Sequence, residues 1–284
     1  MAQTLQAGLL LVSTPIGNAR DITLRALDAL READVLVAED TRSLRRLMEI
    51  HGVPLAGRPL LAYHDHSGPP ARQKVLAYLT EGQRVVYASE AGTPLIADPG
   101  YDLVRAAREA GVAVSAAPGP AAAIMALSLS GLPTDRFFFA GFLPSQAGGR
   151  RKALRALGAV PGTLIFYESP KRLKKSLADM AEILGPGRDA VVARELTKLF
   201  EQVAAAPLGD MAERYAEAAT PKGEIVVLVG PGAEGEIGED DLTALLQAAL
   251  ARHSTKDAVA EVCAQTGLPR KQVYQKALAL LNGS

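Results

Sequence analysis

The chain has 284 residues, 48% of them hydrophobic, and its 31 basic and 31 acidic side chains give a formal net charge of zero. This composition is typical of a soluble globular protein with one large domain or two ordinary ones. No run approaches the ~20 apolar residues that span a bilayer, the amino terminus lacks a secretory signal, and the single cysteine, Cys263, excludes an internal disulfide. These features predict a cytoplasmic protein with no membrane association.

Over residues 1–130, short apolar runs alternate with stretches of helical periodicity. The first run is followed by the helical pattern DITLRALDALREA, where Asp21 or Thr23 is expected near the amino-terminal cap. The predicted strands are LLLVST, DVLVAED, PLLAYHDH, RVVYAS and VAVSAAPG. This alternation predicts an α/β domain with a mainly parallel sheet.

The pattern changes over residues 131–230, which favours a second α/β domain of different connectivity. Helices are expected near 148–157, 170–184 and 208–218, and the strand-like runs are TLIFYES, DAVVARELT, FEQVAAAPL and GEIVVLVG. Residues 231–240 are rich in glycine and acidic side chains and are predicted to be a linker. Residues 241–284 predict three short helices. The last two are compatible with a nucleic-acid-binding helix-turn-helix or with simple packing elements.

The zero net charge hides an uneven distribution along the chain. Residues 148–198 carry 11 basic and 5 acidic side chains, a net of +6, whereas residues 199–240 carry 2 and 9, a net of −7. Basic clusters often only solvate a helix face, but binding to a phosphate backbone requires the same clusters. A nucleic acid partner therefore remains open.

Common cofactor and catalytic motifs are absent from the sequence. It contains neither G-x-G-x-x-G after a strand nor the P-loop pattern, and G-x-S-x-G is missing too. The pair of histidines in HDH, residues 64–66, does not form a metal site unaided. No metal is predicted.

Each predicted strand of the first domain ends in a loop that combines glycine or proline with polar residues. The loops are STPIGN (13–18), AEDTR (38–42), YHDHS (63–67), SEAGTPLIADPG (89–100) and APGPAAA (117–123). Ligands of open α/β sheets bind beyond the carboxyl ends of the strands, so these loops are expected to converge on one crevice. Ordinary turn chemistry explains any one of them, but five in succession favour a ligand site.

These loops resemble those of one enzyme family. The segments that carry the resemblance, from about Gly8 to Gly230, include STPIGNARDITLRALDALREADVLVAEDTR, SEAGTPLIADPG, APGPAAAIMALSLSGLPTDRFFFAGFLP, LIFYESPKRL, ARELTKLFE and KGEIVVLV. They are similar to bacterial 16S ribosomal RNA (cytidine-2′-O)-methyltransferases, of the tetrapyrrole-methylase fold class. TGLPRKQVYQKAL, near the carboxyl terminus, resembles that family's small helical appendix.

The resemblance implies two α/β domains of the tetrapyrrole-methylase type with S-adenosylmethionine between them, plus the helical appendix. It implies methylation of a ribose 2′-hydroxyl of a cytidine at the decoding centre of the small ribosomal subunit, with 16S ribosomal RNA as partner and a homodimeric enzyme. Two alternatives stay open: a tetrapyrrole (precorrin-like) methylase of the same fold, and a non-catalytic RNA-binding ribosome-assembly factor.

Carried over residue by residue, the resemblance assigns cofactor contacts to both domains. The residues are Pro15, Gly17, Ser89, Ala91, Gly92, Thr93, Asp98, Pro99, Pro118 and Gly119 in the first domain, and Tyr167, Glu168 and Glu224 in the second. The family pattern is Ser-Asp-Ala-Gly-Thr-Pro, and this chain has Glu90 in place of the aspartate. The longer side chain shifts any contact of that carboxylate by roughly an ångström.

A ribose hydroxyl is a poor nucleophile at neutral pH, and a positioned base accelerates its attack by about 10²–10⁴-fold. The candidate bases lie at the strand ends of the first domain: Glu39, Asp40, His64, His66 and Glu90. Arg42 either holds an RNA phosphate or pairs with Asp40. The other predicted RNA contacts lie within the basic residues 148–198 and are called the basic block: Arg150, Arg151, Lys152, Arg155, Lys171, Arg172, Lys174 and Lys175.

Overall fold

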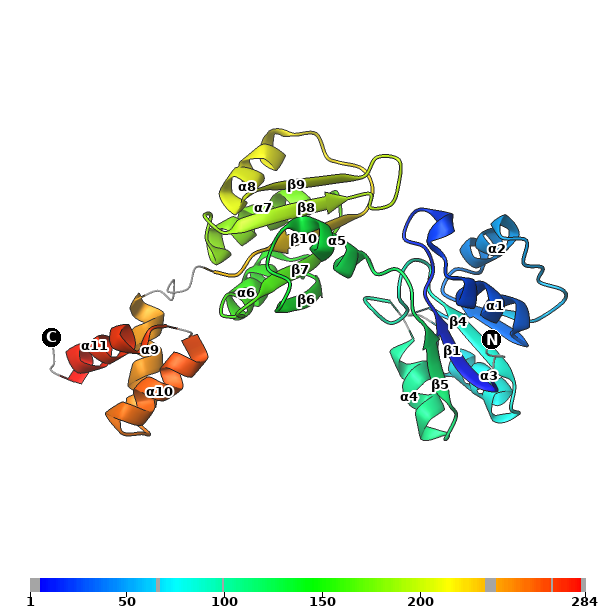
Figure 1. Ribbon diagram of the computed structural model, residues 1–284, viewed down its shortest axis with the longest axis horizontal. Coiled ribbons are helices and arrows are strands. Elements are labelled where there is room, and N and C mark those ends of the chain that lie inside the picture. The colour runs from blue at the N-terminus through cyan, green and yellow to red at the C-terminus, as the bar shows by residue number, and fades with distance from the viewer. Residues whose placement is uncertain (1–5, 65–66, 99, 233–238, 267, 282–284) are drawn as a thin grey trace. The chain divides into compact units, whose positions relative to one another are not determined.

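The structure, a computed structural model, describes residues 6–64, 67–98, 100–232, 239–266 and 268–281 (Figure 1). The chain divides into two compact units. The first comprises Met1–Leu129 and Ala193–Gln202, and the second Ser130–Val192 and Val203–Ser284. The predicted domain boundaries remain a prediction.

The first unit contains a five-stranded sheet in the order β3-β2-β4-β1-β5. Its strands are β1 (Gly8–Val12), β2 (Val35–Ala38), β3 (Leu60–Ala62), β4 (Arg84–Ala88) and β5 (Val114–Ala117), and they pair in parallel. The helices that follow them are α1 (Leu24–Glu32), α2 (Thr41–Ile50), α3 (Gly68–Thr80), α4 (Tyr101–Glu109) and α5 (Ala122–Ser130). The predicted strand–helix alternation and parallel sheet are confirmed.

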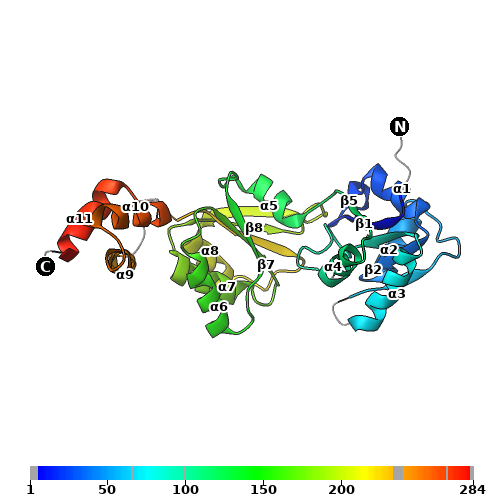
Figure 2. The same ribbon diagram turned by 90° about the horizontal axis from the view of Figure 1, so that it is seen from below.

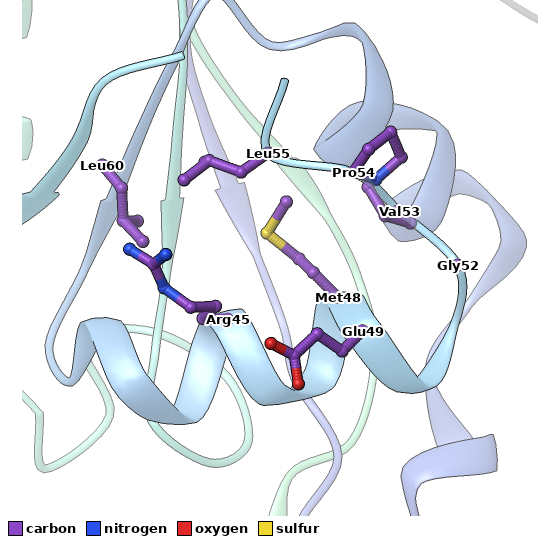
Figure 3. Close-up of a pocket in the computed structure, with 8 residues that line it drawn as sticks. All are labelled: Arg45, Met48, Glu49, Gly52, Val53, Pro54, Leu55 and Leu60. Atoms are coloured by element: carbon purple, nitrogen blue, oxygen red, sulfur yellow. The ribbon is translucent and has the colours of Figure 1, made fainter. Parts of the chain in front are cut away.

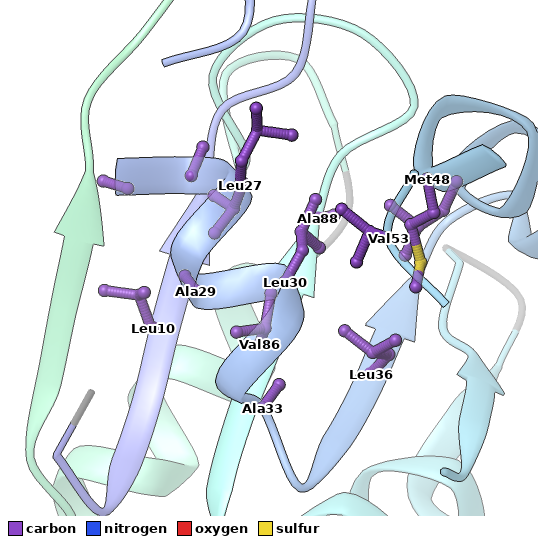
Figure 4. Close-up of a cluster of buried hydrophobic side chains, with 14 of the residues drawn as sticks. Leu10, Leu27, Ala29, Leu30, Ala33, Leu36, Met48, Val53, Val86 and Ala88 are labelled. Carbon is purple, nitrogen blue, oxygen red and sulfur yellow. The ribbon is translucent and has the colours of Figure 1, made fainter. Parts of the chain in front are cut away.

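Hydrophobic side chains alternate between the two faces of this sheet because successive strand residues point to opposite sides. Leu10, Leu36 and Val86 pack with α1 and α2 in one buried cluster, which Figure 4 shows. Their neighbours along the strands pack with α3 and α4 in a second cluster. Both faces are therefore covered, and the strand ends are left for the loops.

A short 3-10 helix, Ala19–Asp21, separates β1 from α1. The helix α1 begins after Thr23, whose hydroxyl accepts a hydrogen bond from the backbone N–H of Ala26 at 3.2 Å. Of the two caps considered from the sequence, Thr23 is the one that forms.

The second sheet has the order β6-β7-β10-β8-β9. Its strands are β6 (Phe137–Phe142), β7 (Thr163–Glu168), β8 (Asp189–Arg194), β9 (Gln202–Pro207) and β10 (Ile225–Val229), with β6 parallel and β10 antiparallel to β7. Its helices are α6 (Ala147–Leu157), α7 (Leu173–Leu184) and α8 (Leu208–Glu217), which pack on the sheet in one buried cluster. The sequence did not predict β6.

The carboxyl-terminal helices are α9 (Glu239–Leu250), α10 (Thr255–Thr266) and α11 (Arg270–Leu281). They bury their own cluster, which includes Leu246, Val262 and Val273, and Figure 2 shows them close to one another. Among the described residues, no helix is both long enough and apolar enough to cross a membrane.

Candidate active site

The loops that follow β1 and β4 are joined directly by their backbones. The N–H of Thr14 donates to the carbonyl of Gly92 at 2.9 Å, and the N–H of Gly92 donates back to Thr14 at 3.0 Å. The two strands are neighbours in the sheet, so their loops leave from the same edge. This pair of bonds fixes the STPIGN loop against the SEAGTPLIADPG loop.

Buried hydroxyl groups extend this connection to the loop after β5. Thr14 Oγ1 donates to the carbonyl of Ser89 at 3.2 Å, and Ser89 Oγ donates to the carbonyl of Gly92. Thr93 Oγ1 donates to the carbonyl of Pro120 at 2.9 Å. Three of the five predicted loops therefore form one hydrogen-bonded assembly at the carboxyl edge of the sheet.

Two glycines make this close packing possible. A Cβ at Gly119 would lie 2.8 Å from the Cβ of Ser13, which is closer than real side chains approach. Gly92 has a φ of +81°, in the left-handed region that favours glycine. Both glycines were predicted as site residues, and the structure gives each a steric reason.

A pocket of about 590 Å³ opens beside this assembly. Its lining combines residues from the segment between β1 and α1, from Asp40 and the length of α2, and from the loop after β4: Thr14, Pro15, Gly17, Ala19, Asp40, Arg42, Ser43, Leu44, Arg46, Leu47, Ile50, Ser89 and Glu90. Six of these were predicted as cofactor, catalytic or RNA-binding residues. The volume is in the range of small-molecule sites.

Asp40 has a structural role in this pocket. Its carboxylate caps α2 by accepting the backbone N–H of Arg42 at 2.8 Å, and it accepts two bonds from the Arg42 guanidinium at 3.2 and 2.8 Å. These bonds, the side-chain bonds foremost, lower the pKa of Asp40 to about 2. Arg42 therefore pairs with Asp40, one of the two roles considered for it, and its side chain stays 90% exposed.

The other candidate bases differ in position. Glu90 is exposed and lines the pocket directly after the buried Ser89. Glu39 and His64 are not among the described residues that line it. The backbone N–H of His64 donates to Ser67 Oγ at 2.7 Å in the turn before α3. His66 lies outside the described residues.

The remaining predicted cofactor residues of the first unit lie on the same loops. Ala91 and Asp98 follow β4, and Pro118 follows β5. Pro99 lies outside the described residues.

In the second unit the side chain of Glu168 is bonded to protein groups. Its side chain is fully buried and accepts bonds from the backbone N–H of Ser169 at 2.8 Å and from the Ser176 hydroxyl, and it pairs with Arg172 at 3.2 Å. A carboxylate held in this way joins β7 to α7, since Ser176 lies on α7. Glu224 is exposed, immediately before β10.

Tyr167 precedes Glu168 on β7 and points to the opposite face of the sheet. Its ring makes edge-to-face contacts with Phe139 and Phe142, with centroids 4.9 and 5.6 Å apart.

Among the basic residues predicted to contact RNA, Arg150 is buried. Its guanidinium pairs with Asp179, which also accepts a bond from Arg151 at 2.8 Å. Burial opposes ionisation of Asp179, but the bonds from Arg151 and Arg150 outweigh it and lower its pKa. Arg151 further pairs with Glu182 at 2.7 Å.

The other members of the block divide between structural and exposed positions. Arg172 donates to the carbonyl of Leu143 in addition to its pairing with Glu168, and Lys174 Nζ donates to the carbonyl of Ala216 at 3.1 Å. The exposed members are Lys152, Arg155, Lys171 and Lys175.

A second pocket, of about 460 Å³, lies between α2 and the segment leading to β3 (Figure 3). Its lining is mainly apolar, and the charged side chains in it are Arg45 and Glu49. It contains none of the predicted site residues.

Comparisons with known proteins identify the family. The family model described as Tetrapyrrole (Corrin/Porphyrin) Methylases matches residues 8–212, and the model described as RsmI C-terminal HTH domain matches residues 236–281. Ribosomal RNA small subunit methyltransferase I from Mesorhizobium japonicum is 48% identical over 284 residues, covering 100% of this chain and 95% of the relative. The chain belongs to this methyltransferase family.

Further comparisons agree with this membership. The family member from Escherichia coli O157:H7 is 46% identical over 98% of this chain and 96% of the relative. Among solved structures, diphthine synthase gives a TM-score of 0.62 at 17% identity, covering 78% of this chain and 90% of that one. Uroporphyrin-III C-methyl transferase from Thermus thermophilus, complexed with S-adenyl homocysteine, gives a TM-score of 0.54 at 23% identity. The match covers 78% of this chain and 97% of that one. These structures share the fold, which confirms the predicted fold class.

The carboxyl edge of this methyltransferase fits the chemistry of S-adenosylmethionine. The cofactor carries a sulfonium and an ammonium group, which suit carbonyl oxygens and carboxylates, and a carboxylate, which suits backbone N–H groups. Asp40 and Glu90 supply carboxylates to the pocket, and Gly119 lets backbone pack closely on Ser13 in the neighbouring loop.

Sequence reasoning missed several residues of this edge. Ser13 and Thr14 belong to the STPIGN loop and are buried with their hydroxyls hydrogen-bonded, but only Pro15 and Gly17 were selected from it. Arg46 lines the pocket one helical turn after Arg42, and this spacing was the available signal.

Proposed function

We propose that this methyltransferase transfers a methyl group from S-adenosylmethionine to the ribose 2′-hydroxyl of a cytidine in 16S ribosomal RNA, at the decoding centre of the small subunit. The observation that carries the proposal is the 48% identity to a ribosomal RNA small subunit methyltransferase I over the whole chain. It includes the carboxyl-terminal helices, which a small-molecule methylase does not require.

The loops after β4 and β5 are the proposed holders of the cofactor in the first unit. Gly92, Thr93, Pro118 and Gly119 belong to the hydrogen-bonded loops at the carboxyl edge, where Gly119 packs closely on Ser13. Tyr167 and Glu224 are the proposed contacts from the second unit. When bound, the cofactor supplies an electrophilic methyl group to an oxygen nucleophile.

Glu90 is the proposed base, which takes the proton from the ribose hydroxyl at its carboxylate. It shares the pocket with Asp40, but Asp40 is bonded to Arg42 and has a pKa of about 2, far from that of an efficient base near neutral pH. Glu90 is the other acidic residue among the described residues that line the pocket.

Arg42 and Arg46 are proposed to hold RNA phosphates at the mouth of this pocket. Both lie on α2 and line the pocket, and their side chains are exposed. The exposed lysines and arginine of the basic block, at positions 152, 155, 171 and 175, would contact phosphates in the second unit. Such contacts orient the RNA without reading its sequence.

We also propose that the protein works as a cytoplasmic homodimer, because ribosomal subunits are cytoplasmic and the β6 strand exposes large aromatic side chains. Phe137 and Phe142 are both exposed on this edge strand. Contiguous exposed apolar surface commonly marks a site of association. Sedimentation equilibrium tests the dimer: a Phe137→Glu variant is expected to shift the protein towards monomer.

The experiment for the activity uses the purified protein, cofactor labelled in its methyl group, and small ribosomal subunits from cells that lack the gene. Label is expected at the 2′-oxygen of one cytidine. Transfer to a tetrapyrrole and not to RNA would identify the alternative methylase. Tight RNA binding without measurable cofactor affinity would identify a non-catalytic assembly factor.

A further inference from the structure

The segment between β8 and β9, residues 195–201, forms an ordered loop of the first unit. At its base, Arg194 donates two hydrogen bonds to Gln202 Oε1, the shorter at 2.8 Å. Within it, Lys198 Nζ pairs with Glu195 at 2.7 Å, and the Thr197 N–H donates to the Glu201 carboxylate at 2.6 Å. The charged groups of the loop are therefore used to hold its own shape.

The backbone of this loop is strained. Glu195 and Thr197 have φ values of +53° and +64°, a region that residues with a Cβ seldom adopt. Strain of this kind persists where the surroundings over-determine a conformation, and it concentrates at functional sites.

The loop contacts the active-site loop that follows β1. The backbone N–H of Asn18 donates to Thr197 Oγ1 at 3.1 Å. A Cβ at Gly17 would lie 2.6 Å from that same Oγ1 and 2.8 Å from the carbonyl of Leu196, so glycine is needed for the two segments to meet. Because Gly17 also lines the 590 Å³ pocket, the loop is anchored beside that pocket.

The tip of the loop presents two large apolar side chains to solvent. Leu199 is 89% exposed and Phe200 is 67% exposed, although Leu196, three residues earlier, is buried. Exposing such side chains on a rigid loop forgoes the burial that usually stabilises them. A rigid, pre-formed apolar tip is instead suited to binding, because little entropy is lost when the partner arrives.

We propose that Phe200 stacks on a base of the substrate RNA next to the target nucleotide, with Leu199 packing against the same or the adjacent base. This rests on the proposed RNA methyltransferase function. Unpaired RNA bases are commonly recognised by stacking on aromatic side chains, and every base offers a face for it. Stacking would hold the target ribose at the pocket, so Phe200 is a positioning residue rather than a catalytic one.

The chain contains no tryptophan, so a single substitution introduces a unique fluorescent reporter. The Phe200→Trp variant is titrated with small subunits that lack the methylation, and its emission is expected to be quenched on binding. The matched control is Leu24→Trp, at an 80% exposed leucine at the start of α1. Its emission is expected to change little. Equal responses from the two variants would overturn the proposal.

Kinetics separate this role from a structural one. Phe200→Ala is expected to raise KM for the small subunit by about tenfold, with the melting temperature and cofactor Kd unchanged, while Phe200→Trp stays near wild type. An unchanged KM, or loss of dimer in the Phe200→Ala variant, would overturn the proposal. If the wild-type protein itself transfers no methyl group to RNA, the proposed function fails instead.

Discussion

At the scale of single residues, the pocket contains two carboxylates, Asp40 and Glu90, whose surroundings differ. Asp40 caps α2 and is bonded to Arg42. These bonds keep its carboxylate ionised and use both of its oxygens as acceptors. Glu90 follows a buried serine and reaches the pocket from the loop after β4, and its charge contributes to the raised pKa of Arg42 after the larger effects of Asp40. One acid organises the arginine while the other remains the candidate for proton transfer.

Replacing Glu90 by glutamine tests this division of roles. Glu90→Gln keeps the size of the side chain but removes the base, so kcat is expected to fall by about 10²–10⁴-fold. The Kd for S-adenosylmethionine, measured by calorimetry, is expected to change little. Glu90→Asp restores the carboxylate found in the family pattern and is expected to retain most of kcat.

The Glu90 assignment is contradicted if Glu90→Gln methylates small subunits at the wild-type rate. A parallel Asp40→Asn variant then shows whether the other acid of the pocket is the base.

At the scale of elements, the β7–α7 connection depends on Glu168. This buried carboxylate binds Ser169, Ser176 and Arg172, and removing one partner of such a group leaves the others unsatisfied. Glu168→Ala is expected to lower the free energy of unfolding by about 3 kcal/mol or more. Urea denaturation measures this loss. An unchanged unfolding midpoint with weaker cofactor binding would restore the ligand role predicted from the sequence.

A second pair joins the beginnings of β2 and β4. Arg84 donates to Asp34 from its backbone N–H at 2.9 Å and from its guanidinium at 3.0 and 2.6 Å. The side-chain hydrogen bond is the main cause that lowers the pKa of Asp34 to about 2, against the opposing effect of burial. A folded-state pKa below the unfolded value means that the pair stabilises the protein when the carboxyl is ionised in both states.

The stabilisation by Asp34 is therefore expected to be complete above pH ~4 and to disappear as the pH falls towards 2. The lowered pKa of Asp34 corresponds to a contribution of about 2 kcal/mol to the free energy of unfolding. Solvent screening reduces this contribution to about 1 kcal/mol because the Asp34 side chain is 38% exposed. Urea unfolding of wild type and Asp34→Asn at several pH values measures the difference. A difference that grows as the pH falls would contradict the expected sign.

Local sequence patterns predicted the elements whose periodicity decides their structure. The strands and helices of the first unit were predicted from this periodicity. The strand β6 was not predicted, because FFFAGF does not alternate between apolar and polar residues. The register of β6 shifts between Phe139 and Gly141, and Gly141 has a φ of +63°. The extra residue brings Phe139 and Phe142, three positions apart, to the same face of the strand, where both rings contact Tyr167.

Features set by distant partners were not visible in the sequence. Arg150 sits in the run GGRRKAL and looks like its exposed neighbours, yet it is buried because Asp179 lies 29 residues away on α7. Likewise, the contact between Asn18 and Thr197 joins residues 179 positions apart. The loops of the site were predictable from glycine, proline and polar composition, whereas their mutual hydrogen bonds were not.

At the scale of the whole molecule, the chain combines a tetrapyrrole-methylase fold with a carboxyl-terminal helical region. The first family model covers residues 8–212 and the second covers residues 236–281. The helices α9, α10 and α11 bury a hydrophobic cluster of their own. This combination matches a methyltransferase whose substrate is much larger than a tetrapyrrole.

The most direct test of the proposed function is nucleoside mass spectrometry of 16S ribosomal RNA from cells that lack the gene. We predict the loss of one 2′-O-methylcytidine, its full return with the wild-type gene, and its absence or strong reduction with the Glu90→Gln variant. An unchanged amount of 2′-O-methylcytidine in the cells without the gene would contradict the account.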